Sequence, residues 1–317
     1  MDSSRRRGYN PGVRALPRAL AALLLTLAAW GPLAAKVRVV ATVFPLGEFA
    51  AAVAGERAEV ELLLPAGAGV HDWQPRPGDL TRLAECDLLL FIGAGLEPWL
   101  PELLRAMPDR KMRTLEAAAG LDLAGAGEEE EEEEHGGTGH GPLDPHVWLD
   151  FELDAGIVRR IAEELARIDP DGAPEFAANA DSLVARLRAL DEKFRVGLAA
   201  CRGKTIVLAG HAAFGYLARR YGLEQMALYG LSPDARPRPK DLMRAVDLCR
   251  ARGIRTVFHE SSVPPDLSRT LAREIGGSVL ALHAGHNPSR DQRARGAGFF
   301  ELMEENLSSL REGLGCR

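Results

Sequence analysis

Three histidines stand where the sequence predicts that strands end and helices begin. His71 follows a glycine-rich turn, His146 follows an acidic tract, and His211 directly follows the apolar run 207–210. In open α/β sheets, side chains beyond the carboxyl ends of the strands meet in one crevice, where ligands bind. Imidazole nitrogen suits Zn²⁺, which prefers tetrahedral sites and binds nitrogen at about 2.0–2.1 Å. We therefore predict a shared metal site, although a single histidine at a strand end is more often a capping or surface residue.

The elements that would carry these histidines alternate between strands and helices in both halves of the chain. β-Branched and apolar runs bounded by Gly or Pro predict strands, and apolar residues at helical spacing predict helices. Such alternation indicates parallel sheets with helices on both faces. The expected strands cover residues 37–44, 58–64, 86–92, 205–209, 225–229, 256–259 and 278–283. The expected helices cover residues 48–53, 77–85, 97–107, 151–169, 173–201, 214–221, 240–252, 267–275 and 297–314.

The first 35 residues have the layout of a secretory signal. Five arginines precede a short apolar run, residues 19–30, and small residues follow it up to Ala35. The run is shorter than the about 20 apolar residues that a spanning helix needs. We expect export and cleavage near Ala35. Removing these five Arg and one Asp changes the formal net charge from −6 to −10, which opposes nucleic-acid binding and suits a protein that handles cations.

The four cysteines form no CxxC pair, so neither a zinc knuckle nor a redox motif is indicated. One disulfide is plausible in an oxidising compartment. We favour Cys249 with Cys316, because both fall in the C-terminal half of the chain; the sequence does not prove the pairing.

Several motifs, in order along nearly the whole mature chain, resemble the zinc-uptake solute-binding proteins of ABC importers (the cluster A-I family, which includes ZnuA-like proteins). Any one of these motifs would be a weak signal, whereas their agreement in order is a strong one. The main motifs are Leu64-Pro65-Ala66-Gly67, His71-Asp72-Trp73-Gln74-Pro75-Arg76, Asp144-Pro145-His146-Val147-Trp148, Gly210-His211-Ala212-Ala213-Phe214 and Pro237-Arg238-Pro239-Lys240-Asp241-Leu242.

The resemblance implies an α/β fold of two lobes, each a mostly parallel sheet flanked by helices, joined by a long rigid linking helix. The expected divisions are a signal peptide at 1–35, an N-terminal lobe at 36–150, a linking segment at 151–202 and a C-terminal lobe at 203–317. The metal is expected between the lobes.

Carried over residue by residue, the resemblance makes His71, His146 and His211 the first three metal ligands. Relatives that carry manganese usually have Glu at the place of His211, so the histidine favours zinc, in line with its preference for nitrogen ligands. Many relatives place an Asp in the loop after the last strand, but residues 284–288 contain none. His286 is the nearest candidate there.

Other interpretations of the fourth position and of the remaining histidines stay open. Glu260 or a water molecule could fill the position instead of His286, and Glu260 could alternatively orient a ligand histidine. His259 and His283 lie in strand-like runs and are expected to be packed or exposed. The acidic loop 124–143 resembles the charged loop of zinc-specific members, so His135 and His140 are either a weak zinc-gathering site or part of a solvated, mobile charge run.

The resemblance implies a monomeric, periplasmic protein that captures Zn²⁺ and delivers it to an ABC permease in the inner membrane. Two alternatives remain: a zinc-dependent exported hydrolase, and a manganese-binding or adhesin-type member of the same fold. The hydrolase is the weaker one, because neither HExxH nor GxSxG occurs in the sequence. We expect no enzyme activity and no nucleic-acid partner.

Overall fold

The computed structural model describes residues 35–71, 73–108, 111–125, 143–228, 230–231, 239–261 and 265–317. The expected signal segment lies outside these residues except for Ala35, and so do His135 and His140. Within this part of the chain, no helix is both long enough and apolar enough to cross a membrane.

The first sheet consists of parallel strands in the order β2-β1-β3-β4. Apart from the exposed Arg38 of β1, its central strands are apolar on both faces, as expected for a sheet that is covered on both sides. β4 was not expected from the sequence, because its four residues include two charged ones and bury only Leu115. The strands are β1 (Val37–Ala41), β2 (Ala58–Leu62), β3 (Leu88–Phe91) and β4 (Arg113–Glu116).

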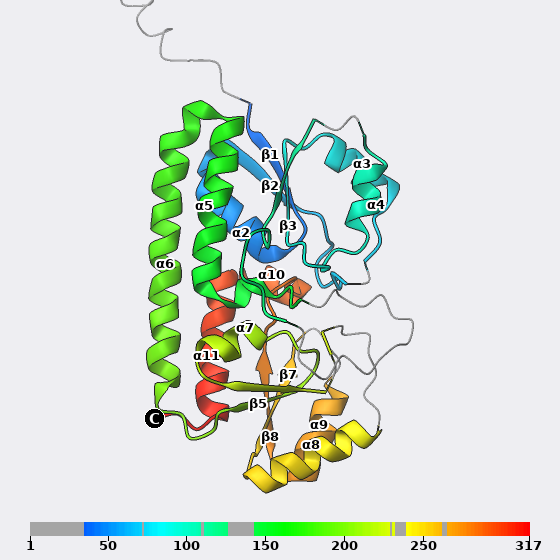
Figure 1. The fold of residues 1–317 in the computed structure, drawn as a ribbon, viewed down its shortest axis with the longest axis vertical. Helices are drawn as coiled ribbons and strands as arrows, with labels where there is room; N and C mark the ends of the chain where they lie inside the picture. Colours follow the sequence, from blue (N-terminus) through cyan, green and yellow to red (C-terminus); the bar gives the residue numbers. More distant parts are fainter. Residues whose placement is uncertain are drawn as a thin grey trace, which may run out of the picture. The chain divides into compact units, whose positions relative to one another are not determined.

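Helices cover both faces of this sheet (Figure 1). α2 (Phe44–Ala54) lies on the side of the long helices, and α3 (Pro77–Ala84) and α4 (Leu100–Arg105) lie on the other. α2 begins four residues before the expected start at Glu48. Pro45 stands in its first turn, where the missing N–H has no helical partner to lose, so the proline starts the helix rather than ending the strand.

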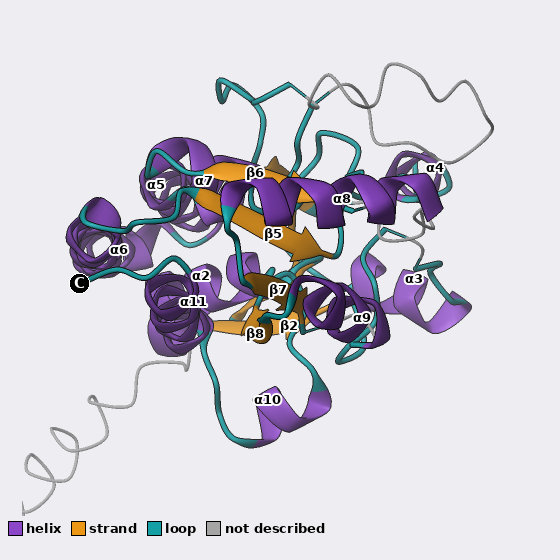
Figure 2. Cartoon of the chain, turned by 90° about the horizontal axis from the view of Figure 1, so that it is seen from below, coloured by secondary structure: helices purple, strands orange, loops and turns teal. Residues whose placement is uncertain are grey.

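The second sheet repeats the topology of the first, with parallel strands in the order β6-β5-β7-β8. α9 and α11 pack on opposite sides of β7 and β8 (Figure 2). The strands are β5 (Thr205–Ala209), β6 (Glu224–Ala227), β7 (Thr256–Glu260) and β8 (Ser278–Leu282). The helices are α7 (Gly215–Arg220), α8 (Pro239–Arg252), α9 (Asp266–Ile275), α10 (Arg290–Ala294) and α11 (Phe299–Gly313).

A long helix joins the two α/β parts. α6 (Ala173–Ala199) has 27 residues, which corresponds to about 40 Å at 1.5 Å per residue. It packs against α2 and α5 (Phe151–Ile168) beside the first sheet and against α11 beside the second. Its buried stripe includes Leu183, Leu187 and Phe194. The predicted fold of two parallel-sheet lobes joined by a long helix is confirmed.

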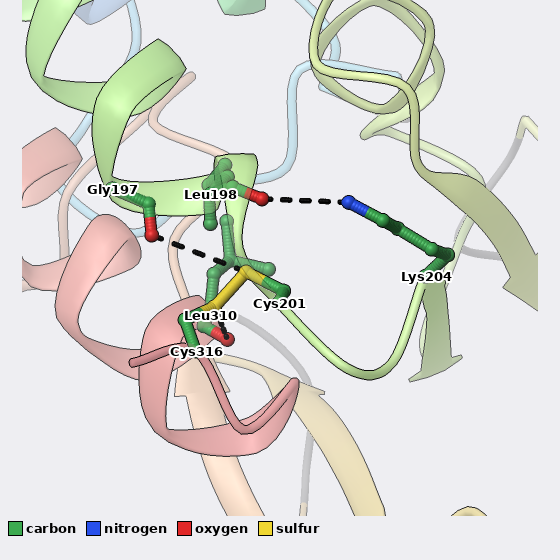
Figure 3. Close-up of a disulfide and its surroundings, with 6 residues drawn as sticks. All are labelled: Gly197, Leu198, Cys201, Lys204, Leu310 and Cys316. Atoms are coloured by element: carbon green, nitrogen blue, oxygen red, sulfur yellow. Dashed lines mark hydrogen bonds between the residues drawn. A yellow bond between two sulfur atoms is a disulfide. The ribbon is translucent and has the colours of Figure 1, made fainter.

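The disulfide lies elsewhere than the sequence suggested. Cys201 bonds to Cys316 (Figure 3), and Cys249 is a free, buried thiol on α8. The prediction of a Cys249–Cys316 bond was therefore wrong. Cys201 follows the end of α6 and Cys316 follows the end of α11, and these two helices pack side by side. The bond thus ties the linking helix to the C-terminal helix.

Candidate metal centre

The three predicted ligands come from separate segments and meet in the interior. His71 lies in the loop after β2, His146 immediately precedes the short 3₁₀ helix Val147–Leu149, and His211 follows β5. His146 and His211 are fully buried, and His71 is 6% exposed. One nitrogen of each ring lies within 4.8 Å of the others, and among the described residues no second such group of His, Cys, Asp or Glu is found.

His146 and His211 point the same ring atom at each other. Their Nε2 atoms are 3.2 Å apart. The Nδ1 of His146 lies 2.7 Å from Asp144 Oδ1, and the Nδ1 of His211 lies 2.6 Å from Glu260 Oε2. An ionised carboxylate only accepts hydrogen bonds, so it favours the tautomer that has its proton on Nδ1 and a lone pair on Nε2.

Two lone pairs at this separation repel unless a cation or a proton lies between them. A carboxylate behind the Nδ1 of a histidine is also the usual support of a metal-binding imidazole, because it fixes the tautomer and raises the basicity of Nε2. The arrangement of the two rings therefore fits a nitrogen-ligated metal ion.

Local backbone geometry explains how Asp144 supports His146. The Asp144 Oδ1 atom also accepts the backbone N–H of His146 at 2.9 Å, so one oxygen holds both the chain and the ring. The hydroxyl of Tyr216, on α7, donates to the backbone carbonyl of Asp144 at 3.0 Å. This role of Asp144 was not predicted from the sequence, although the Asp-Pro-His spacing could have suggested it, because an Asp side chain commonly bonds the backbone two residues on.

Glu260 bonds His211 on the side of the ring away from His146 Nε2. It ends β7, is 1% exposed, and uses Oε2 to bond the Nδ1 of His211. Gly210 makes this approach possible, because a Cβ there would lie 2.9 Å from the same carboxylate oxygen. Of the two roles considered for Glu260, the geometry matches the orienting one.

His286 lies beside the three-nitrogen group without belonging to it. Its ring centroid is 6.3 Å from those of His71 and His211, whereas the His146 and His211 centroids are 5.1 Å apart. Burial lowers the pKa of His286 to about 4, against the opposing influence of Glu260. Its Nδ1 atom is buried and has no hydrogen-bond partner in the described part of the chain. A neutral, poorly satisfied imidazole is thus held next to the centre.

The other described histidines do not join this group. His283 hydrogen-bonds Ser261 and Gln292 through Nδ1, at 2.8 and 2.9 Å, and contacts Glu305 through Nε2 at 2.9 Å. Burial lowers the pKa values of both His283 and His259. These two residues are packed in the second lobe.

Comparisons with known proteins identify the family of this chain. The family model described as zinc-uptake complex component A, periplasmic (ZnuA) matches residues 39–313. The zinc-binding lipoprotein AdcA of Streptococcus pneumoniae serotype 4 is 33% identical over 279 residues, covering 87% of this chain and 56% of AdcA. The chain thus spans little more than half of that relative. The high-affinity zinc uptake system protein ZnuA of Bacillus subtilis is 31% identical over 281 residues, covering 88% of each protein.

A solved structure shares the fold over most of the chain. The crystal structure of the Zn(II)-bound ZnuA-like domain of Streptococcus pneumoniae AdcA superposes with a TM-score of 0.75 at 30% identity, and the match covers 88% of this chain and 99% of that domain. Because the family model covers most of the chain, from β1 to α11, the chain belongs to the ZnuA family of zinc-uptake complex components.

Proposed function

We propose that this chain captures Zn²⁺ as cargo outside the inner membrane and delivers it to an ABC permease. The observation that carries the proposal is the facing pair of Nε2 atoms of His146 and His211, 3.2 Å apart and each backed by a buried carboxylate. A buried, prearranged pair of lone pairs costs free energy in the absence of a cation, and a bound metal ion removes that cost.

His71 supplies the third nitrogen. His286 lies outside this group in the structure, but its buried Nδ1 has no hydrogen-bond partner in the described part of the chain, and it would complete the site as the fourth ligand. A site of neutral imidazoles favours zinc over manganese, because manganese prefers harder oxygen ligands. The carboxylates that bond His146 and His211 lie behind these two rings, at Nδ1. The centre therefore differs from a carboxylate-rich manganese site.

The same geometry argues against a hydrolase. A catalytic zinc site keeps one coordination position open for water and needs a base close to it. All four histidines are at most 6% exposed, and Glu260, the base that the sequence offered, is bonded to the far side of His211. We infer that the chain binds and releases metal without catalysis.

The wider organisation follows from the family. We propose a signal peptide at 1–35, lobes at 36–150 and 203–317, and a linking segment at 151–202 in a monomeric periplasmic protein. α6 packs against elements of both lobes, which supports a linker that resists large hinge motion. Release would then require the permease to disturb the ligand loops. The acidic loop, whose ends pair at Gly125 and Leu143, attaches next to Asp144 and would gather zinc weakly near the site.

The test compares the mature wild-type protein with His211→Ala. Metal analysis after dialysis, followed by competition with a chromogenic zinc chelator, measures stoichiometry and affinity. We expect one tightly held zinc per wild-type chain and a loss of at least about a hundredfold in affinity in the variant. A wild-type protein without tight zinc, or a variant that binds like the wild type, contradicts the proposal.

A further inference from the structure

Asn287, the residue after His286, bonds the loop that carries His71. Its Nδ2 donates to the backbone carbonyls of Pro65 and Ala68, at 2.8 Å each. Pro65 and Ala68 belong to the first lobe, more than 200 residues away in sequence. Asn287 is 9% exposed, and both bonds are partly buried.

The two carbonyls that accept these hydrogen bonds belong to a tight turn. The Ala68 N–H donates to the Pro65 carbonyl at 3.1 Å, and Gly67 has a φ of 76°, which glycine adopts without strain. Asn287 therefore bonds both ends of this turn. His71 lies three residues beyond Ala68, so the position of the turn sets where the His71 segment begins.

The orientation of the Asn287 amide is fixed by its neighbours. The Nη2 of Arg293 donates to Asn287 Oδ1 at 2.7 Å. A guanidinium can only donate and backbone carbonyls can only accept, so the amide has one arrangement that satisfies all of these partners. Arg293 thus holds the NH₂ group toward the first lobe.

The loop that carries His286 has two more bonds to the segments around it. The Phe44 N–H donates to the His286 carbonyl at 2.8 Å. The Nε1 of Trp148 donates to the Ala284 carbonyl at 2.7 Å, which connects the loop to the segment of His146. Of these contacts, those of Asn287 are the ones that reach the loop of His71.

We propose that Asn287, oriented by Arg293, is a latch between the lobes that positions His71 and His286 together and so sets how long zinc stays bound. The inference rests on the proposed zinc-binding function and deepens it. While the latch is closed, His71 cannot move away from the C-terminal lobe without breaking these two partly buried hydrogen bonds. A permease that opens these bonds would loosen ligands from both lobes in one step.

The experiment measures zinc dissociation by stopped-flow, with an excess of a fluorescent chelator, for the zinc-loaded mature protein and Asn287→Ala. We expect the dissociation rate to rise about tenfold, which corresponds to about 1.4 kcal/mol, with little change in the association rate. Asn287→Asp should release zinc at least as fast as Asn287→Ala, because its carboxylate cannot donate to the two carbonyl oxygens and repels them. Asn287→Gln keeps the amide, so its zinc dissociation rate should lie between those of the wild type and Asn287→Ala.

Asn179→Ala is the matched control. It removes a similar bond, from Asn179 Nδ2 to the Val53 carbonyl at 3.0 Å, between α6 and α2. If Asn287→Ala folds poorly, Arg293→Met tests the same latch, because the amide loses the donor that orients it. Hydrogen exchange of the peptide 63–71 provides a second readout and should quicken in the latch variants but not in the control.

The outcomes separate the two proposals. A wild-type protein that holds zinc, together with latch variants that release it no faster than Asn179→Ala, overturns the latch alone. A wild-type protein that holds no zinc overturns the proposed function and the latch with it. Faster release confined to the latch variants supports both.

Discussion

Replacing Glu260 tests whether the carboxylate behind His211 raises the zinc affinity of the site. We expect Glu260→Gln to keep the shape of the side chain but to remove the carboxylate that bonds the Nδ1 of His211 at 2.6 Å. The Nε2 of His211 then becomes less basic, and an amide that donates to Nδ1 would favour the tautomer with its proton at Nε2, where the metal must bind. Losing such a partner typically costs 10- to 100-fold in metal affinity, or about 1.4–2.8 kcal/mol.

The assay is the shift in melting temperature that zinc produces, together with the zinc affinity from chelator competition. Because zinc binds the folded state, its stabilisation at a fixed free concentration falls by the same free energy that the affinity loses. Glu97→Gln is the control, since Glu97 is also a buried carboxylate but bonds the Thr42 hydroxyl and the backbone at residues 92–93. Wild-type affinity in Glu260→Gln, or an equal loss in the control, would refute the reasoning.

Three further predictions concern pH, the disulfide and a buried acid. Protons compete with zinc for imidazole, which ordinarily titrates near pH 6.5, so zinc affinity should fall from pH 7.5 to 5 in isothermal titrations. Because the pKa of His286 is lowered to about 4, His286→Ala should bind more weakly but keep the same pH profile over this range, and a flat wild-type profile would contradict the account. Replacing Cys201 and Cys316 by Ser should lower the free energy of unfolding by about 2–4 kcal/mol in urea titrations, whereas Cys249→Ser should leave the disulfide intact when free thiols are counted under denaturing conditions. Asp154 is fully buried, neither of its carboxylate oxygens has a hydrogen-bond partner in the described part of the chain, and burial raises its pKa well above the usual value. The folded state thus keeps a proton that the unfolded state loses as pH rises above about 3.9, which lowers stability at neutral pH. Asp154→Asn should therefore raise the free energy of unfolding at pH 7.5 and change it little near pH 3.5. An equal change in the free energy of unfolding at the two pH values would contradict this reasoning.

Local patterns in the sequence predicted most of the fold. β5 and α6 were placed within two residues of their observed bounds, because apolar runs and helical spacing are strong local signals. β4 was missed, since a four-residue edge strand with one buried side chain leaves almost no periodic pattern. The start of α2 was misplaced because Pro45 was interpreted as the end of the strand.

The site was predictable in part. His71, His146 and His211 were identified as a converging set from their places after strands and from the family motifs, and the structure brings their nitrogens together. The contact of Asn287 with the turn at Pro65 could not be foreseen, because it joins residues from opposite lobes with no local pattern. The same holds for the Cys201–Cys316 bond, which depends on the packing of two helices distant in sequence.

The most direct test of the central claim is an anomalous difference map at the zinc absorption edge, from crystals of the zinc-loaded mature protein. The account predicts one strong peak per chain, about 2.0–2.1 Å from the Nε2 atoms of His146 and His211, with His71 as a third ligand and His286 completing the site. A peak bound by other residues, or no peak in crystals grown with zinc, would contradict it.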